Sequence, residues 1–314
     1  MKDYLHPFLY YLVFVFWFCA SLLPLRVLYI FSDFLFCLVY YVARYRRRIV
    51  RKNLCDSFPD KSLKEIIHIE KGFYSFFCDY LVETIKLFSI SREQMQRRMK
   101  FEGVDELQNE IDKGRSCSVY LGHYCNWEWI SSLPMYFGKE VIFGQIYHAL
   151  ENKWFDRLFL YMRGRFGAKS IEKEESFKYI MSWRKNGIST IVGYIADQVP
   201  GYNSMHYFTQ FMNHDTPVFS GAERIARVMD TAVFFTDITR VKRGYYVCRF
   251  IKITDDVGSM PKFSVTEKYI RLLEDNIKRA PEYWLWSHNR WKRTREEFER
   301  KYTKEEQDKL RSRL

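Results

Sequence analysis

The sequence predicts an α/β fold, in which a sheet carries helices on its faces, preceded by an N-terminal membrane helix. Two observations support this prediction. From residue 118 onward, short apolar stretches typical of strands alternate with stretches of helical periodicity. The first fifty or so residues instead combine long uncharged runs with a basic cluster, which is typical of a membrane-anchored chain.

The composition favours a globular protein that works next to an anionic surface. The chain has 314 residues and 47% apolar content, enough for one large domain or two ordinary ones around a real core. Lys and Arg outnumber Asp and Glu by 50 to 38, which gives a net charge of +12 and predicts anionic partners. The 18% aromatic content suits a lipid interface or a large core. Seven scattered cysteines without a C-x-x-C pair argue against a disulfide framework or a zinc site, so we expect neither metal nor cofactor.

The N-terminal apolar run predicts a membrane anchor. Phe8–Leu23 reads FLYYLVFVFWFCASLL, sixteen residues without a charge, and with its flanks it approaches the length that crosses a bilayer. A second run, Val27–Ala43, is interrupted by Ser32 and Asp33 and predicts an interfacial or bundle-packed helix. A cleaved signal peptide is the alternative. It is disfavoured because the apolar stretch continues past a short h-region and no clear small-x-small site follows.

A basic cluster follows these runs. The segment Arg44–Lys52, RYRRRIVRK, carries six positive charges, which predicts that this side of the membrane and everything after it are cytoplasmic. Behind a membrane segment, such a cluster is better suited to lipid headgroups than to nucleic acid. We therefore divide the chain into a membrane anchor (residues 1–52), a catalytic domain (53–294) and a charged C-terminal helix or tail (295–314).

Periodicity predicts the elements of the catalytic domain. Lys61–Lys86 has apolar residues at helical spacing, and Ser91–Lys100 is a polar connector or short helix. The predicted strands are Ser118–Leu121, Val141–Tyr147, Ser189–Ala196, Ala232–Ile238 and Tyr245–Ile253, and the predicted helices are Asn126–Met135, Asn152–Arg163, Ser176–Lys185, Gly221–Val228 and Val265–Arg279.

An H-x4-E motif follows the first of these strands. The strand ends at Gly122, His123 comes next, and Glu128 follows five positions later. Within one helix, five residues turn two side chains about 140° apart. We therefore expect His123 in a loop and Glu128 in the first turn of a helix capped by Asn126. A carboxylate there would orient the imidazole and favour its charged form, which predicts a general base at a strand end.

Further blocks follow this motif in order. They are RGRFGAKSI with Arg163, Arg165 and Gly167; ADQVPG with Asp197 and Gln198; NHDTPVFSGAERIAR with Thr216 and Pro217; and EYWLWSHNRWK with Trp284, His288, Arg290 and Lys292. Together with the anchor and the α/β pattern, these blocks resemble the late acyltransferases of lipid A biosynthesis. That lauroyl/myristoyl transferase family lies within the lysophospholipid acyltransferase superfamily. The resemblance extends over roughly residues 5–294, and FMNHD stands where many members have a Phe-Gly pair.

The resemblance implies a glycerol-3-phosphate acyltransferase-like fold, with a mixed sheet flanked by helices. It also implies transfer of a fatty acyl chain from acyl carrier protein, or coenzyme A, to a hydroxyl of an anionic lipid A precursor at the inner membrane. In this mechanism His123 is the general base and Glu128 its partner, with no covalent acyl-enzyme. The resemblance assigns substrate binding to Arg163, Arg165, Asp197, Gln198 and Arg290.

Several alternatives stay open at this point. Arg163 and Arg165 are either a phosphate-binding pair or ordinary surface charges. Asp197 and Gln198 either touch substrate or position a loop. Cys125 lies two residues from His123, but nothing else supports an acylated nucleophile there.

Two other functions also stay open. The chain could acylate another lipid, such as a lysophospholipid or an aminolipid. It could also be a non-catalytic basic scaffold at the membrane surface, for which His123 and Glu128 would be dispensable.

Overall fold

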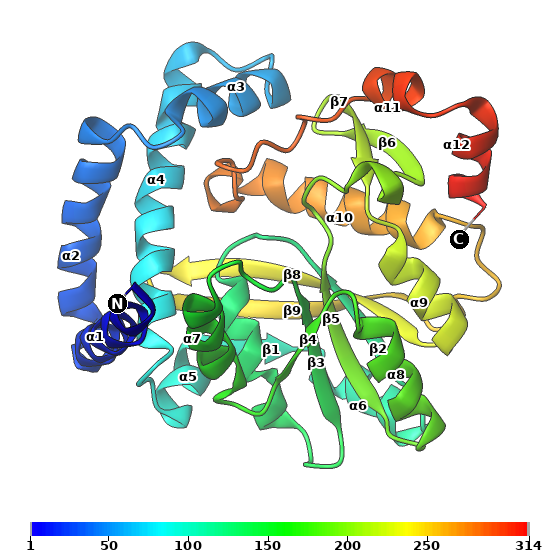
Figure 1. The fold of residues 1–314 in the computed structure, drawn as a ribbon, viewed down its shortest axis with the longest axis horizontal. Coiled ribbons are helices and arrows are strands. Elements are labelled where there is room, and N and C mark those ends of the chain that lie inside the picture. The colour runs from blue at the N-terminus through cyan, green and yellow to red at the C-terminus, as the bar shows by residue number, and fades with distance from the viewer. Residues whose placement is uncertain (1, 313–314) are drawn as a thin grey trace.

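The computed structural model describes residues 2–312 and has an α/β architecture with a seven-stranded mixed sheet at its centre (Figure 1). The strand order is β1-β9-β8-β2-β5-β3-β4, and each neighbouring pair is parallel except β8 and β9. The predicted α/β class, with helices flanking a mixed sheet, is confirmed. The strands are β1 (Met99–Glu102), β2 (Cys117–Leu121), β3 (Ile142–Tyr147), β4 (Lys169–Glu172), β5 (Thr190–Ile195), β8 (Ala232–Lys242) and β9 (Tyr245–Thr254).

Five of these strands lie where the sequence predicts them, but β1 and β4 do not appear among the predicted strands. Both are four residues long and form the two edges of the sheet. An edge strand buries few side chains, and β1 and β4 each bury a single residue. A strand with so little apolar patterning gives a weak sequence signal.

Helices cover both faces of the sheet (Figure 1). On one face the ring of Tyr120 in β2 lies 5.2 Å from that of Tyr269 in α10 (Ser264–Arg279). On the other face the thiol of Cys117 contacts the carbonyl of Leu107 in α6 (Val104–Asp112). Side chains three residues apart in a strand point to opposite faces, so β2 is buried between two helical layers. The other elements of this domain are α5 (Arg92–Arg98), η2 (Trp127–Tyr136), α7 (Lys153–Gly164), α8 (Ser176–Lys185), α9 (Gly221–Met229) and η4 (Pro281–Tyr283).

The helix predicted over Asn126–Met135 forms as η2, a 3₁₀ helix rather than an α-helix. Local chemistry favours the tighter turn. The hydroxyls of Ser131 and Ser132 donate to the carbonyls three residues back, at 2.6 and 2.7 Å. Pro134, inside η2, has no N–H to offer an α-helical bond.

The described part of the chain begins with helices α1 (Lys2–Leu22), α2 (Leu25–Cys37), α3 (Arg47–Ser57) and α4 (Leu63–Lys86). Helix α2 continues through a π-helical turn, Leu38–Val42, and lies along α4 (Figure 1).

Among the residues whose side chains the structure describes, the helix long and apolar enough to be a candidate membrane span is Leu25–Val42, 18 residues with a mean hydropathy of 1.7. The predicted span, Phe8–Leu23, begins outside those residues, and its described part, Tyr11–Leu22, is a shorter apolar helix. The prediction assigned the span to Phe8–Leu23 because Ser32 and Asp33 interrupt the second run. Asp33 is compatible with this helix because it pairs with Arg243 of the folded domain at 2.6 Å.

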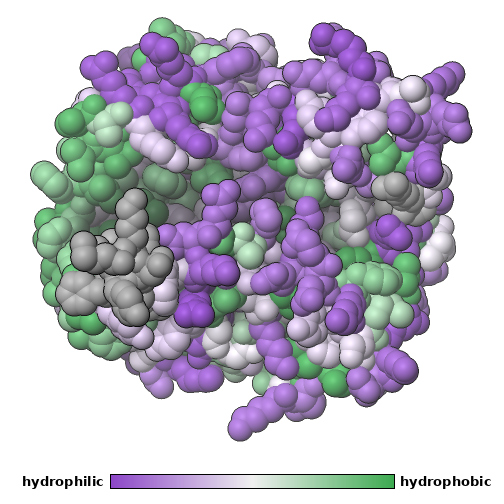
Figure 2. Space-filling view, in the orientation of Figure 1, coloured by the Kyte–Doolittle hydropathy of each residue, from purple (hydrophilic) through white to green (hydrophobic). Residues whose placement is uncertain are grey.

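The outer surface of the first two helices is apolar. Helix α2 buries Leu25, Leu28, Tyr29 and Ser32, while Ile30 and Phe34 on its other side keep 69% and 71% exposure. We call the exposed side chains of these helices the apolar face; Figure 2 shows it as the green region on the left. It comprises Tyr11, Leu12, Val15, Phe16, Phe18, Leu22, Leu23, Val27, Ile30, Phe31, Phe34, Leu38, Tyr41 and Val42. An exposed apolar surface of this extent is typical of a protein that contacts a membrane or a partner.

The charged C-terminus forms two short helices rather than the single helix that the sequence predicts. Helices α11 (Arg295–Lys301) and α12 (Lys304–Arg311) each begin with a capping box. They pack beside the hairpin of β6 (Tyr207–Phe211) and β7 (His214–Val218) (Figure 1). Phe298 and Leu310 bury themselves with Met205 in a small satellite core, which fixes this segment to the domain.

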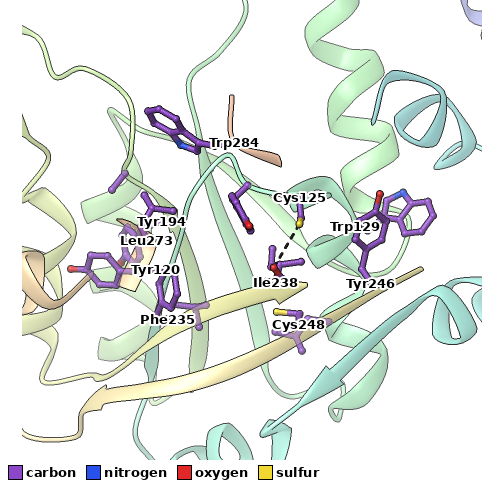
Figure 3. Close-up of a cluster of buried hydrophobic side chains, with 14 of the residues drawn as sticks. Tyr120, Cys125, Trp129, Tyr194, Phe235, Ile238, Tyr246, Cys248, Leu273 and Trp284 are labelled. Atoms are coloured by element: carbon purple, nitrogen blue, oxygen red, sulfur yellow. Dashed lines mark hydrogen bonds between the residues drawn. The ribbon is translucent and has the colours of Figure 1, made fainter. Parts of the chain in front are cut away.

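A buried aromatic cluster lies next to the segment that connects β2 to η2. Figure 3 shows the thiol of Cys125 directed toward the carbonyl of Ile238 in β8, and Trp129 of η2 beside Tyr246 of β9. The Trp129 and Tyr246 rings meet edge to face, with centroids 5.7 Å apart. This packing fixes the connecting segment against the sheet.

Candidate active site

Two neighbouring strands end at the same edge of the sheet, and each is followed by a titratable side chain. Strands β2 and β5 are parallel, with Leu121 opposite Ile195. His123 comes two residues after β2, and Asp197 comes two residues after β5. In open α/β sheets, ligands bind beyond the carboxyl ends of the strands. The topology therefore brings His123 and Asp197 together at the expected place for a site.

Asp197 holds both the ring and the backbone of His123. Nδ1 of His123 lies 2.6 Å from Oδ1 of Asp197, and the backbone N–H of His123 donates to Oδ2 at 2.8 Å. Trp284 donates from Nε1 to the same Oδ2 at 2.9 Å. The side chain of His123 keeps 19% exposure, whereas that of Asp197 keeps 2%. The ring is thus fixed through Nδ1, and Nε2 is left to meet a reacting group.

Gly122 makes this contact possible. A Cβ at position 122 would stand 2.7 Å from Cδ1 of Leu273 and 3.3 Å from Oδ2 of Asp197. A larger residue would push the loop away from the carboxylate, so the glycine at the strand exit is required by close packing rather than by an unusual φ.

The surroundings of Asp197 keep it ionised. Burial by itself would raise its pKa, but the attraction of His123 and the hydrogen bonds from His123 and Trp284 outweigh burial. Together they lower the pKa of Asp197 to about 2. An ionised carboxylate on Nδ1 favours the tautomer in which Nε2 is the basic nitrogen.

Glu128 has a different partner from the one expected. It lies in the first turn of η2, and the predicted cap is confirmed, because Oδ1 of Asn126 accepts the N–H of Trp129 at 3.2 Å. Its carboxylate receives a two-pronged contact from Arg163 of α7, from Nε at 2.8 Å and from Nη2 at 2.5 Å. The expected contact of Glu128 with the ring of His123 is therefore wrong. Asp197 contacts the ring instead. A bidentate guanidinium is the stronger partner for a buried carboxylate.

Arg163 keeps Glu128 ionised. Burial would raise its pKa, but the attraction and hydrogen bonds of Arg163 lower it, and the charge of His123 adds a smaller effect in the same direction. Glu128 is 5% exposed, and its lowered pKa keeps it in the charged form.

Gln198 lies on the open side of the imidazole. Its Nε2 is 3.3 Å from Nε2 of His123. A neutral His123 with its proton on Nδ1 accepts a hydrogen bond from this amide, in the position that a substrate hydroxyl would take. Of the residues that the resemblance assigned to substrate binding, Gln198 is the one placed directly at the reactive nitrogen.

The two arginines of the RGRFG block do not point to one common anion. Arg163 binds Glu128, as described above. Arg165 donates from Nη1 to the carbonyl of Leu87, just after α4. In each case other guanidinium nitrogens are left for further contacts.

Arg290 and His288 lie behind the site. Arg290 has no exposed surface and donates from Nη2 to the carbonyl of Pro217 at 2.7 Å, so it supports the wall of the site rather than its opening. Burial lowers its pKa to about 10, and the nearby Asp197 opposes that shift. His288 accepts the backbone N–H of Val199 at 3.3 Å, and burial lowers its pKa to about 4, as suits a packed, neutral histidine.

Cys125 is a structural residue. Its side chain is fully buried and its thiol contacts the carbonyl of Ile238 (Figure 3). Burial raises the pKa of this thiol well above its usual value, which disfavours the reactive thiolate.

Aromatic side chains line a small pocket beside the site. Two of its walls touch the charged pairs: Trp127 meets the ring of His123 edge to face at 5.1 Å, and Tyr80 lies against Glu128. These rings make the surface beside His123 apolar at the point where the charged groups end. Its lining residues are Phe73, Phe76, Phe77, Tyr80, Trp127, Tyr283, Trp284 and Leu285.

The described residues hold no group of three or more His, Cys, Asp or Glu side chains arranged to bind a metal ion. The donors at the site are instead one imidazole, two carboxylates, guanidinium groups and an amide, a set that suits proton transfer and binding of anions.

Sequence reasoning missed the residues that come from distant parts of the chain. Tyr80 and Trp127 were not considered for the site, and Asp197 was named without its contact to His123. A usable signal was present for Asp197, because both residues follow the end of a predicted strand within two positions. Strand ends that neighbour each other in a parallel sheet share one edge.

Comparison with known families places this geometry in context. The family described as bacterial lipid A biosynthesis acyltransferase matches residues 1–293. That range includes the first two helices, the sheet and all the site residues discussed above, and it ends just before α11. None of the curated proteins compared with the chain matches it.

Proposed function

Because the chain belongs to the bacterial lipid A biosynthesis acyltransferase family, we propose that it transfers a fatty acyl chain from acyl carrier protein to a hydroxyl of a lipid A precursor. The observation that carries the mechanism is the His123–Asp197 pair, with Nδ1 bound at 2.6 Å and the ring still partly exposed. This is the arrangement of an oriented general base.

In the proposed reaction, Nε2 of His123 removes the proton of the acceptor hydroxyl while that oxygen attacks the thioester carbonyl. The C–O bond forms, the C–S bond breaks, and the carrier leaves as a thiol after it takes the proton back from the imidazolium. Asp197 holds the tautomer and stabilises the imidazolium. Gln198 lies close enough to Nε2 to meet the same reacting oxygen.

Glu128 and Arg163 support this chemistry from the side. Glu128 contributes negative charge near the imidazolium, and Arg163 balances that charge. The free Nη1 of Arg163 and the free nitrogens of Arg165 are candidates for the phosphate groups of the acceptor, since guanidinium forks suit phosphate geometry.

The net charge of +12 suits an acidic carrier protein as the acyl donor. The test compares label transfer to a purified lipid A precursor from acyl carrier protein and from coenzyme A thioesters. A lysophospholipid is the control acceptor. We expect transfer from the carrier protein to the lipid A precursor; activity on the lysophospholipid alone would assign the chain to another lipid, and no transfer at all would favour a scaffold.

For location, we propose that the apolar face sits in the inner membrane and that the catalytic domain is cytoplasmic. Support comes from the exposed side chains of α1 and α2 and from the basic segment Arg44–Lys52. Reporter fusions at the C-terminus should be active only in the cytoplasm. A periplasmic signal would exclude a cytoplasmic carrier protein as the donor.

A further inference from the structure

A buried carboxylate outside the catalytic pairs connects the membrane-facing helix to the catalytic segment. Glu83 of α4 has no exposed surface and accepts three side-chain hydrogen bonds. The hydroxyl of Tyr29 donates to Oε1 at 2.7 Å; Nδ2 of Asn126 and the hydroxyl of Tyr246 donate to Oε2 at 2.6 and 2.8 Å. The three donors come from α2, from the β2–η2 segment and from β9, so Glu83 joins three separate parts of the fold.

The three hydrogen bonds to the carboxylate of Glu83 should hold its donors in fixed positions. Burial raises the pKa of Glu83, whereas the three hydrogen bonds oppose that shift by favouring the charged form. A buried carboxylate is costly unless its oxygens are satisfied. Removing one donor should therefore disturb the contacts of the other two.

On the catalytic side, Glu83 fixes the start of η2. Asn126 is the cap of that helix and lies between His123 and Glu128 in the sequence. The backbone carbonyl of Glu83 also accepts Nε1 of Trp129 at 3.2 Å, and Trp129 packs on Tyr246 (Figure 3). Two anchors on one residue of α4 thus set the position of the segment that carries both site residues.

On the membrane side, Tyr29 belongs to the inner surface of α2. The next two residues, Ile30 and Phe31, belong to the apolar face and are 69% and 56% exposed. Insertion of such side chains into a lipid surface would hold α2 in place, since burial of apolar area is favourable. The same helix therefore meets lipid on one side and Glu83 on the other.

Resting on the proposed function, we propose that Glu83 is a positioning residue through which contact of α2 with a lipid surface orders the catalytic segment from His123 to Glu128. The lipid supplies binding energy to α2, and Tyr29 transmits the position of α2 to Glu83 and Asn126. The chain would then be more active at a membrane than in its absence.

The same helix supplies a matched control. Ser32, one turn after Tyr29, donates to Asp79 of α4 at 2.7 Å. Asp79 is as well buried as Glu83 but binds Arg240 and Arg243 rather than the catalytic segment. Tyr29→Phe and Ser32→Ala each remove one hydroxyl between α2 and α4, and only the first leads to Asn126.

The first test measures hydrogen exchange of the peptide that spans residues 123–130, in full-length protein, with and without mixed vesicles of phosphatidylethanolamine and phosphatidylglycerol. In the parent and in Ser32→Ala we expect vesicles to slow exchange of this peptide. In Tyr29→Phe that slowing should be lost, with exchange about tenfold faster than in the parent on vesicles.

The second test measures turnover of the same variants with the lipid acceptor in vesicles. Tyr29→Phe should lower kcat with little change in KM, while Ser32→Ala should match the parent. The double variant Tyr29→Phe/Glu83→Gln should be little worse than Glu83→Gln alone, because both act through one junction. Thermal melts check that each variant is folded.

These measurements separate two kinds of failure. Equal exchange of the 123–130 peptide in Tyr29→Phe and Ser32→Ala on vesicles would overturn the positioning role, whatever the activity. Normal exchange behaviour together with a parent that transfers no acyl group would instead overturn the proposed function and leave the coupling through Glu83 in place.

Discussion

The His123–Asp197 and Glu128–Arg163 pairs lie side by side at one edge of the sheet, yet they differ in what each leaves open. In the first pair the acid is buried and the base keeps 19% exposure, with Nε2 directed away from the carboxylate. In the second pair both carboxylate oxygens of Glu128 bind Arg163, and Glu128 keeps 4% side-chain exposure.

This difference separates two roles. A base must present a lone pair to the substrate, and Nε2 of His123 faces only the amide of Gln198, at 3.3 Å, whose place a substrate hydroxyl could take. Glu128 has its lone pairs directed to a guanidinium, so it suits charge balance and positioning rather than proton transfer. One motif thus supplies two residues to two different pairs, and each pair is completed by a residue from elsewhere in the chain.

The largest effect is expected from substitutions that break the His123–Asp197 pair. His123→Ala should lose about 10²–10⁴-fold in turnover, the usual cost of removing a general base. Asp197→Asn should lose nearly as much because the amide no longer favours the reactive tautomer. Because the two residues act as one unit, the double variant should be little worse than His123→Ala. The measurement is label transfer to the lipid acceptor, and near-parental turnover in a well-folded His123→Ala protein would end the proposed mechanism.

The next largest effect is expected from substitutions that break the Glu128–Arg163 pair. Arg163→Lys keeps the charge but loses the two-pronged contact, and Glu128→Gln loses the charge. We expect each to lower turnover about 10- to 100-fold, less than the loss of His123, with a strong coupling energy between them in a double-mutant cycle. Arg249→Lys is the matched control, because Arg249 of β9 forms an exposed ion pair with Glu102 of β1 instead. Equal losses for the two Lys variants would mean that the contact with Glu128 has no special role.

The comparison also indicates which features of the site could be predicted from the sequence alone. It predicted the strand before His123, the cap at Asn126 and the helix that begins there, because these depend on neighbours in the chain. The partner of each charged residue depends on which strands and helices become neighbours in space. Arg163 follows Glu128 by 35 positions and Asp197 follows His123 by 74, so local patterns could not decide between them.

The N-terminal helices teach the same lesson. Counting charges favoured Phe8–Leu23 as the span, since Asp33 appeared costly in the second run. In the folded protein Asp33 pairs with Arg243, 210 positions later, and Ser32 pairs with Asp79. Ser32 is thereby buried against α4, whereas Asp33 keeps 63% side-chain exposure and is balanced by the charge of Arg243.

A smaller effect is expected in the dependence of protein stability on pH, to which the buried carboxylate of Asp197 contributes. Folding lowers the pKa of Asp197 from an ordinary 3.8 to about 2. Since the folded pKa is depressed, the ionised carboxylate stabilises the protein fully above about pH 4, and this stabilisation, about 2 kcal/mol, is lost as the pH falls toward 2. Asp197→Asn should therefore flatten the dependence of unfolding free energy on pH in that window, measured by denaturant titration. The control is Asp60→Asn, a substitution at an exposed position, which should leave the dependence of unfolding free energy on pH as it is in the parent.

The smallest effect is expected at Cys125, and it decides whether His123 acts directly on the acceptor. If His123 activated Cys125 as a nucleophile, Cys125→Ser would lose almost all activity. The thiol is instead buried against Ile238, on the side of the segment that faces the sheet, and its raised pKa disfavours a thiolate. A serine can keep the contact with that carbonyl, so turnover should stay within about threefold of the parent, a difference of less than ~1 kcal/mol in the barrier. Mass spectrometry of protein quenched during turnover should find no acyl group on the Cys125 peptide. An acylated Cys125, or an inactive but folded Cys125→Ser variant, would replace direct transfer by a two-step route and make the His123–Asp197 pair the activator of a thiol.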